Sequence, residues 1–441
     1  MRTLPKNFTA PHAGSSVAAA PVVRVASPAK AVHTAPVHEW PGRELMADPM
    51  LARILLAVWS GDPLCVTPAA PGSGKTRLAT LLAAALAHRA GLRVAVAAQT
   101  REQALELARR MSTISDRYAL IVSAATAKTG YLKGVRTVTG SRVRWSHPTG
   151  GAVLIGTAAR WLYVDPSVGA ADVLLIDEAW QATYADAGAL GALARQVVLV
   201  GDSGQIAPVV TGSTARWEGR ATGPHQSAPA ALLAAHGSAA TVHELTNSWR
   251  LGPKTCAVLS EHFYPQMPFT SRRPDEAVTT DTGKDLSEIV CLPVKSRNGP
   301  TDPVLMEAVA DRVRELLNYQ YRRGGQGAAL SGQDIAVVVP HVAQAGAVRA
   351  LLSDIDGVMI GTSNGLQGQE RPAVVALHPM AGYRQVQSFA VDPGRTCVTL
   401  SRHRGHMTLV TDPATVGLLA ADDDPMSGAA LNALEAVMGM G

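Results

Sequence analysis

From residue 64 onward, short apolar runs alternate with longer stretches whose apolar residues recur at helical spacing. The first group of runs lies at 64–67, 94–98, 120–123, 153–156, 173–176 and 197–200, with predicted helices at 75–90 and 101–112. A second group follows at 289–294, 335–339, 358–361, 374–377 and 407–410, with helices at about 302–320 and 341–353. Apolar strands separated by helices are typical of parallel sheets covered by crossover helices. The sequence therefore predicts an α/β fold with two parallel sheets in tandem.

Composition predicts where these two units begin and end. Residues 1–40 are rich in Ala, Pro, Val and Ser without periodicity, which predicts a disordered tail. A cleaved targeting peptide is the alternative, because no acid precedes Glu39. Gly, Ala, Pro and Ser accumulate again in 212–245. We expect a first domain at 41–215, a linker at 216–240, a second domain at 241–425 and a C-terminal tail at 426–441.

The charge and the cysteines limit the partners and the compartment. The net charge of +5 suits a polyanionic partner, but +3 of it lies in residues 1–40. The four cysteines form no CxxC pair, so we expect reduced thiols in a cytoplasmic protein and no zinc site. No apolar run reaches the roughly 18 residues of a membrane span, so no membrane partner is expected.

A glycine-rich turn separates the first predicted strand from the first predicted helix. Residues 69–76 are Ala-Ala-Pro-Gly-Ser-Gly-Lys-Thr, which is the pattern of a phosphate loop except that its first position is Ala instead of Gly. Its glycines allow backbone N–H groups to face phosphate oxygens, while Lys75 would reach the β- and γ-phosphates and Thr76 would bind Mg²⁺. The expected ATP-binding residues here are Pro71, Gly72, Ser73, Gly74, Lys75, Thr76 and Arg77.

Two later strands end in polar side chains at the same predicted sheet edge. Asp177 and Glu178 follow the apolar run at 173–176, and Gln205 lies in Gly-Asp-Ser-Gly-Gln after the run at 197–200. In open parallel sheets, ligands bind at the carboxyl ends of the strands. We expect Asp177 to bind Mg²⁺, Glu178 to orient or deprotonate the attacking water, and Gln205 to sense the γ-phosphate. A solvated pair of acids at a strand end is the alternative.

Six ordered segments, including these two strand ends, resemble the motifs of superfamily 1 helicases. They lie at 176–183, 199–210, 245–253, 339–344, 365–370 and 395–404, and the resemblance extends from about residue 64 to 411. Among them are Leu-Val-Gly-Asp-Ser-Gly-Gln-Ile-Ala-Pro-Val-Val at 199–210 and Arg-Thr-Cys-Val-Thr-Leu-Ser-Arg-His-Arg at 395–404. The likeness is greatest to the branch that contains the RNA helicase of nonsense-mediated decay and related DNA helicases.

The resemblance implies two tandem RecA-like P-loop NTPase domains with an ATP cleft between them. It assigns Arg250 and Arg402 of the second domain to the γ-phosphate, with Arg404 as the alternative to Arg402. It assigns Glu370 to the nucleotide ribose. Charge that develops on a transferred phosphoryl group is well stabilised by arginine, so such residues would couple ATP to closure of the cleft. The expected catalytic residues are Lys75, Glu178, Gln205, Arg250 and Arg402.

Nucleic acid is expected to cross both domains. By resemblance, the contacts to its backbone would come from Gln99, Thr100, Thr157, Thr362 and Gln367. Residues 126–149 contain five basic residues without an acid, interleaved with Tyr131 and Trp145. Such a stretch suits a single strand, although a solvated connecting loop fits it equally well. The sequence lacks the family's glutamine motif within 44–59 and has no room for a barrel insertion between Lys75 and Gln99.

These observations predict an ATP-dependent helicase or translocase that moves along single-stranded DNA or RNA. The resemblance implies movement from 5′ to 3′, and protein partners are compatible with so small a motor. The alternative is a nucleic-acid-stimulated ATPase that remodels a protein–nucleic acid complex without unwinding a duplex. A P-loop kinase is a third reading, but it does not account for a second α/β domain that ends in paired arginines.

Overall fold

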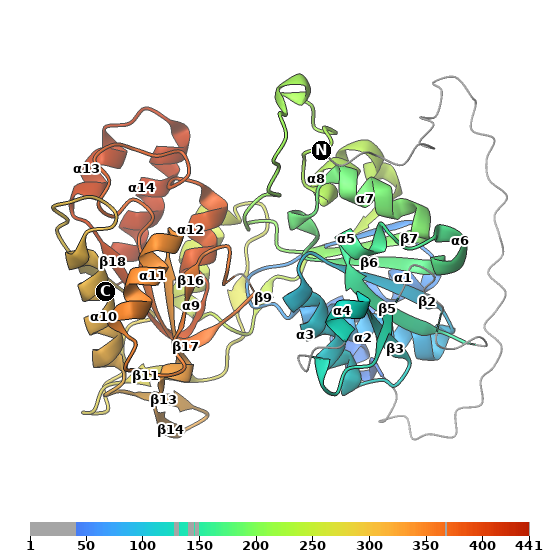
Figure 1. Ribbon diagram of the computed structural model, residues 1–441, viewed down its shortest axis with the longest axis horizontal. Helices are drawn as coiled ribbons and strands as arrows, with labels where there is room; N and C mark the ends of the chain where they lie inside the picture. Colours follow the sequence, from blue (N-terminus) through green and yellow to red (C-terminus); the bar gives the residue numbers. More distant parts are fainter. Residues whose placement is uncertain (1–40, 128–131, 140–144, 146–149, 367, 441) are drawn as a thin grey trace.

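The computed structural model describes residues 41–127, 132–139, 145, 150–366 and 368–440. Two sheets dominate it, one in each half of the molecule, and each is covered by helices on both faces (Figure 1). The predicted tail at 1–40 lies outside the described residues, as do Gln367 and part of the basic stretch at 126–149.

The first sheet contains eight parallel strands in the order β4-β3-β5-β2-β6-β7-β1-β8. Their bounds are β1 Leu64–Pro68, β2 Arg93–Ala98, β3 Tyr118–Val122, β4 Thr137–Thr139, β5 Ala152–Thr157, β6 Ala171–Asp177, β7 Ala194–Gly201 and β8 Ala240–Val242. The central strands are buried on both faces, which explains their continuous apolar sequences. β1 lies between β7 and β8, so the phosphate loop that follows it emerges beside the ends of its neighbours.

Helices pack on both faces of this sheet and form two cores. Val94 and Val96 of β2 pack with α2 and α3, while Ala95 and Ala97 face the core that includes Trp161. This alternation follows from the two-residue period of a strand. The helices are α1 Pro49–Ser60, α2 Lys75–Ala85, α3 Arg101–Ser112, α4 Ala124–Ala127, α5 Ala158–Trp161, α6 Pro166–Gly169, α7 Tyr184–Leu190 and α8 Ala228–His236.

The second sheet contains five parallel strands in the order β12-β18-β17-β15-β16. Their bounds are β12 Ile289–Pro293, β15 Ile335–Val339, β16 Met359–Thr362, β17 Arg371–Leu377 and β18 His403–Thr411. The helices are α9 Pro253–Phe263, α10 Pro303–Leu316, α11 Val342–Leu351, α12 Pro393–Leu400, α13 Ala414–Ala420 and α14 Pro425–Met438. Smaller sheets pair β9 Asn247–Ser248 with β10 Thr270–Ser271, and β11 Glu276–Thr279 with the hairpin of β13 Gln320–Arg323 and β14 Gln326–Ala329.

The predicted α/β class with two tandem parallel sheets is confirmed, and every predicted strand corresponds to a strand of one of the two sheets. The predicted helix at 75–90 consists of α2 followed by a π-helical turn at Leu86–Ala90. The 216–240 segment contains α8 and leads into β8, which pairs with β1. The 426–441 segment lies almost wholly in α14, whose Leu434 and Val437 are buried. The domain bounds themselves stay predictions.

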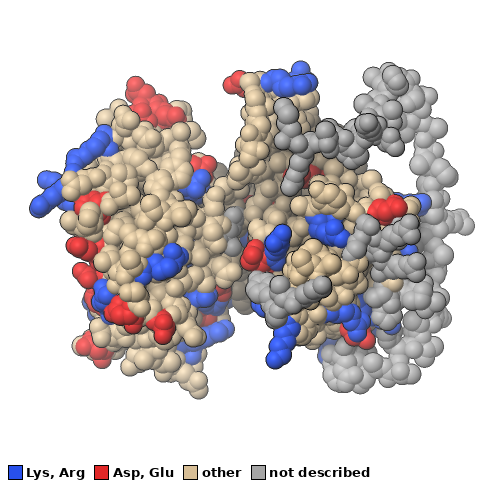
Figure 2. All heavy atoms as spheres, in the orientation of Figure 1, with Lys and Arg blue, Asp and Glu red and all other residues tan. Residues whose placement is uncertain are grey.

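Acidic and basic side chains are mixed on the face of the molecule that Figure 2 shows. Figure 2 shows acidic and basic side chains interspersed over both halves of the described part of this face, without one continuous basic stripe. Within the described residues, no helix is long and apolar enough to cross a membrane. All four cysteines are free thiols, and Cys65, Cys256 and Cys397 are buried.

Candidate nucleotide site between the two domains

The phosphate loop has the backbone that its glycines allow. Gly72 and Gly74 have φ angles of 74° and 86°, in the left-handed region, and Gly74 is the N-cap of α2. Lys75 and Thr76 thus begin a helix whose free N–H groups and positive end favour an anion. The Ser73 hydroxyl is buried and has no hydrogen-bond partner among the described residues. A phosphate oxygen would supply the missing partner.

The Lys75 ammonium pairs with Asp202 at the end of β7. Lys75 Nζ lies 3.3 Å from Asp202 Oδ2, and both side chains are buried. The same carboxylate accepts hydrogen bonds from Gln205 Nε2 at 2.9 Å and from the hydroxyl of Tyr264, which belongs to the second domain. A lysine and a glutamine predicted for the phosphates are therefore both tied to one carboxylate, which the sequence-based site did not include.

Asp177 and Glu178 lie beside the loop, and both carboxylates are buried. Burial and the neighbouring Glu178 carboxylate together raise the pKa of Asp177 to about 7, against the opposing effect of Lys75. The pKa of Glu178 is raised as well, chiefly by burial, against the effect of Lys75. Glu178 has a φ of 51°, the only positive value for a non-glycine among the described residues. A bulky residue in this region is strained, which is common where a side chain is aimed at a reacting group.

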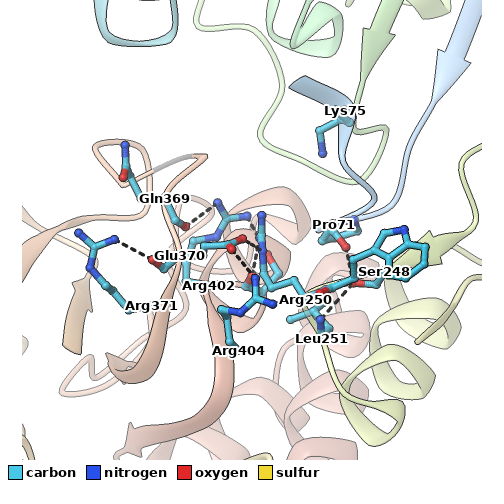
Figure 3. A network of polar contacts seen from close by, with 12 residues as sticks. Pro71, Lys75, Ser248, Arg250, Leu251, Gln369, Glu370, Arg371, Arg402 and Arg404 are labelled. Atoms are coloured by element: carbon cyan, nitrogen blue, oxygen red, sulfur yellow. Dashed lines mark hydrogen bonds and ion pairs between the residues drawn. The ribbon is translucent and has the colours of Figure 1, made fainter. Parts of the chain in front are cut away.

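Charged residues of the second domain form an ion-pair network that faces the phosphate loop (Figure 3). Glu370 pairs with Arg250 through one carboxylate oxygen and with Arg404 through the other, the latter at 2.6 Å. Arg404 also pairs with the buried Glu276 at 2.8 Å. Burial alone would raise the pKa of the Glu370 carboxyl, but Arg250 and Arg404 outweigh burial and lower it to about 2. The predicted contact of Glu370 with a ribose stays a prediction.

Arg402 differs from Arg404 in having no carboxylate within ion-pair distance among the described residues. It is buried, donates to the Val398 carbonyl at 3.0 Å and to Ser401 Oγ at 2.9 Å, and is held by its own domain. Burial and the neighbouring Arg250 lower its pKa to about 10. The charge of Arg402 is therefore compensated only from a distance, by Asp202 and Glu178. Of the two arginines left open by the sequence, Arg402 is the one with a charge still to be paired.

One cavity of about 840 Å³ lies between the phosphate loop and the second-domain arginines, whereas Asp177 lines a smaller cavity beside it. Residues of both domains line the larger cavity, and in Figure 3 the Lys75 side chain extends toward the side on which Arg250, Arg402 and Arg404 lie. Predicted residues that line it are Gly72, Gly74, Lys75, Thr76, Arg77, Glu178, Gln205, Arg250, Glu370 and Arg402. Arg77 is also tied at the surface to Glu44 at 2.5 Å, and the Pro71 carbonyl accepts from Ser248 Oγ at 2.7 Å.

The residues present fit ATP and a divalent cation. Cationic side chains of both domains line the cavity, among them Lys75, Arg250 and Arg402, which suits three phosphates. Thr76 and Asp177 are close together, since both line the smaller neighbouring cavity and the Thr76 hydroxyl helps to lower the pKa of the Asp177 carboxyl. A hydroxyl and a carboxylate are the protein ligands that Mg²⁺ takes beside phosphates. Bound Mg²⁺ would neutralise phosphate charge and favour the ionised form of Asp177.

Comparison with known proteins agrees with this geometry. Residues 52–226 match a family described as an AAA domain, and residues 227–414 match a second family with the same description. Two such domains in tandem over residues 52–414 are typical of superfamily 1 helicases, the family whose motifs this sequence resembles. No curated protein sequence matches it significantly.

Viral helicases are among the solved structures similar to this chain. One is the PRRSV helicase, with 14% identity and a TM-score of 0.42 over 81% of this chain and 54% of that chain. Another is non-structural protein 10 (helicase) of an arterivirus, with 15% identity and a TM-score of 0.44 over 86% of this chain and 64% of that chain. The same arterivirus protein in complex with DNA has 15% identity and a TM-score of 0.43, with 86% and 65% covered. The chain thus spans just over half to about two thirds of these proteins.

The predicted nucleic-acid residues of this chain are spread over both domains. Gln99 donates to the Asp177 carbonyl at 3.4 Å, which links the end of β2 to the acidic pair. Thr100 and Thr157 cap α3 and α5, and the Thr362 hydroxyl accepts from a turn N–H at 3.2 Å. A second cavity, of about 340 Å³, contains Thr100 together with Asn364 of the second domain. Contact with nucleic acid stays a prediction for all of them.

The basic stretch at 126–149 is described only in part. Trp145 is buried in the first-domain core, and the Arg93 guanidinium lies 5.8 Å from its ring centroid. Its ring therefore packs inside the domain, which removes it as a stacking surface for bases. Tyr131, Lys128, Arg142 and Arg144 lie outside the described residues.

The sequence-based site missed three groups that the structure adds. Asp202 lies in the strand-end segment that supplied Gln205, so its position at the sheet edge was a usable signal. Tyr264 and Glu276 contact the site from the second domain, and neither belongs to a recognisable motif. Only the tertiary structure brings them to the cleft.

Proposed function

We propose that the protein hydrolyses ATP with Mg²⁺ and uses the hydrolysis to move along single-stranded nucleic acid from 5′ to 3′. The observation that carries the proposal is the single cavity in which Lys75, Glu178 and Gln205 of one domain face Arg250 and Arg402 of the other. Because both domains contribute residues to the site, bound nucleotide would hold the domains together and its release would let them separate. The direction rests on the family resemblance alone.

The proposed roles follow from the contacts in the site. Lys75 and the loop N–H groups would bind phosphate oxygens, while Thr76 and Asp177 would bind Mg²⁺, which supplies charge neutralisation. The raised pKa of Glu178 suits a general base, because a carboxylate with a higher pKa accepts a proton from water more readily. Arg402 would stabilise charge on the γ-phosphate, since its own charge has no near counter-ion.

Movement would come from closure of the cleft. Arg250 and Arg402 belong to the second domain, so their attraction to the γ-phosphate would draw the domains together and hydrolysis would release them. The predicted contacts to a nucleic-acid backbone come from both domains, with Thr100 in the first and Thr362 in the second. The free thiols, three of them buried, fit a reducing compartment, and we include the cytoplasm in the proposal.

The decisive experiment is an ATPase assay with ssDNA, ssRNA and duplexes side by side. We expect either single strand to stimulate hydrolysis, and Lys75→Ala to abolish it while the matched exposed variant Lys284→Ala does not. An ATP hydrolysis rate that is the same with and without ssDNA or ssRNA would refute the proposed movement along nucleic acid. A strand-displacement assay then separates the two candidate activities: stimulated hydrolysis without displacement of any duplex would favour remodelling without unwinding.

A further inference from the structure

A second-domain tyrosine reaches into the phosphate site of the first domain. Tyr264 directly follows α9, and its side chain is almost fully buried. Its hydroxyl donates to Asp202 Oδ1, the carboxylate that pairs with Lys75. Its ring meets Phe269 edge-on, with centroids 5.2 Å apart and an interplanar angle of 86°. The phenol is therefore held in place by its own domain while it contacts the other.

The loop that carries Asp202 is enclosed by the second domain on two sides. A Cβ on Gly204 would lie 2.4 Å from the Cζ atom of Tyr264. A Cβ on Gly394, at the start of α12, would lie 2.7 Å from the backbone carbonyl of Gln205. Only glycines allow approaches this close. The position of the second domain is thus transmitted to the 202–206 loop by direct contact.

Asp202 is a completely buried carboxylate with four partners. Oδ2 lies 3.3 Å from Lys75 Nζ and accepts from Gln205 at 2.9 Å, while Oδ1 accepts from Tyr264 and from the Gly204 N–H at 3.1 Å. On ATP binding, Lys75 would shift at least part of its hydrogen bonding from Asp202 to phosphate oxygens. The carboxylate then depends on its remaining donors, because a buried charge without partners is strongly destabilising.

We propose that Tyr264 is a positioning residue that makes ATP binding depend on the position of the second domain. Its hydroxyl stabilises the Asp202 carboxylate when Lys75 moves to the phosphates. With the second domain in place, the phenol is present and the transfer of Lys75 is favourable. With the second domain withdrawn, Asp202 retains Lys75. The inference rests on the proposed function, because it deepens the role of the same nucleotide site.

Tyr264→Phe tests this by removing one hydroxyl and leaving the ring contacts. A hydrogen bond to a charged group contributes roughly 1.5–3 kcal/mol, and about 1.4 kcal/mol corresponds to a tenfold change in a binding constant. We expect the dissociation constant for ATP, measured by titration calorimetry, and the KM for ATP to rise about tenfold, with kcat within about twofold of wild type. Tyr383→Phe is the matched control, because that hydroxyl contacts His341 at 2.6 Å, within the second domain. It should change neither constant.

A double-mutant cycle shows whether the hydroxyl acts through Asp202. In an Asp202→Asn background, Tyr264→Phe should no longer change ATP affinity, because no charge remains to be stabilised. An unchanged ATP affinity in Tyr264→Phe, or an equal loss with and without Asp202→Asn, would overturn the inference while leaving the ATPase intact. A wild-type chain that binds no ATP would overturn the proposed function and this inference together.

Discussion

The contact between the phosphate loop and Arg250 makes a sharp prediction at Gly72. A Cβ on Gly72 would lie 2.5 Å from Arg250 Cβ and 2.9 Å from Ser248 Oγ. Gly74 has a similar left-handed φ, but a Cβ there would meet nothing within 4 Å. Gly74→Ala therefore adds only a backbone penalty, whereas Gly72→Ala adds that penalty and a collision between the domains.

The two variants should differ in how much free energy of unfolding they lose. The left-handed conformation costs an L-residue about 1–2 kcal/mol. The collision of the added Cβ with Arg250 and Ser248 costs a further 1–3 kcal/mol, roughly, as overpacking does in protein cores. We therefore expect Gly74→Ala to lower the free energy of unfolding by about 1–2 kcal/mol and Gly72→Ala to lower it by about 2–5 kcal/mol. Both values lie below the roughly 5–15 kcal/mol of a typical folded domain, so both proteins should fold.

Urea denaturation followed by tryptophan fluorescence measures this difference. Trp249 is a neighbouring reporter. Its backbone N–H donates a hydrogen bond to the Gly72 carbonyl at 2.9 Å, and the residue is 53% exposed. The first unfolding transition is the relevant one, since a two-domain protein need not unfold in a single step. Equal destabilisation by the two alanines would refute the proposed contact and, with it, the coupling of the loop to Arg250.

Three further predictions concern the charged groups. Glu178→Gln should retain ATP binding and lower kcat by about 10²–10⁴, as measured by phosphate release; normal turnover would rule out Glu178 as the base. The raised pKa of Asp177 means that the folded nucleotide-free protein holds a proton that the unfolded chain releases. The stabilising effect of that proton is complete below about pH 4 and lost as pH rises through about 7. Asp177→Asn should flatten this slope in urea midpoints measured across that range, and an unchanged slope would place the titration elsewhere. Arg404→Ala should destabilise the fold by about 1–3 kcal/mol because it removes a partner of the buried Glu276, whereas Arg402→Ala should lower kcat more than stability. The reverse pattern, measured by paired kinetic and unfolding assays, would exchange their roles.

The features that could be predicted from the sequence are those formed by residues close together in the chain. The continuous apolar runs were predicted to be strands buried on both faces, and each of them lies in a strand of one of the two sheets. Gly72, Gly74 and Lys75 lie in one turn because the turn itself is local in sequence. Asp177 and Glu178 lie beside them because parallel strands place their carboxyl ends at one edge.

The partners of these residues could not be predicted, because they are distant in sequence. The pairing of Arg250 with Glu370 joins segments 120 residues apart, and that of Tyr264 with Asp202 joins segments 62 apart. The left-handed backbone of Glu178 is equally hidden, because nothing in its residue type favours that conformation. β8 escaped prediction because three residues are too short to show a period.

The path of the chain between the two sheets has a consequence for how the protein can be divided. After β8, the Leu245 N–H bonds the Pro68 carbonyl at 2.8 Å and the Leu245 carbonyl accepts from Ala70 at 3.0 Å. The crossing segment thus continues along β1 before it enters the second half. The two family matches meet between residues 226 and 227. A cut there would leave β1 as an unpaired edge strand in the first fragment and would leave β8 without its partner strand in the second. The separated halves would be prone to aggregate, and the smallest piece able to fold alone from the N-terminal side should extend beyond Leu245.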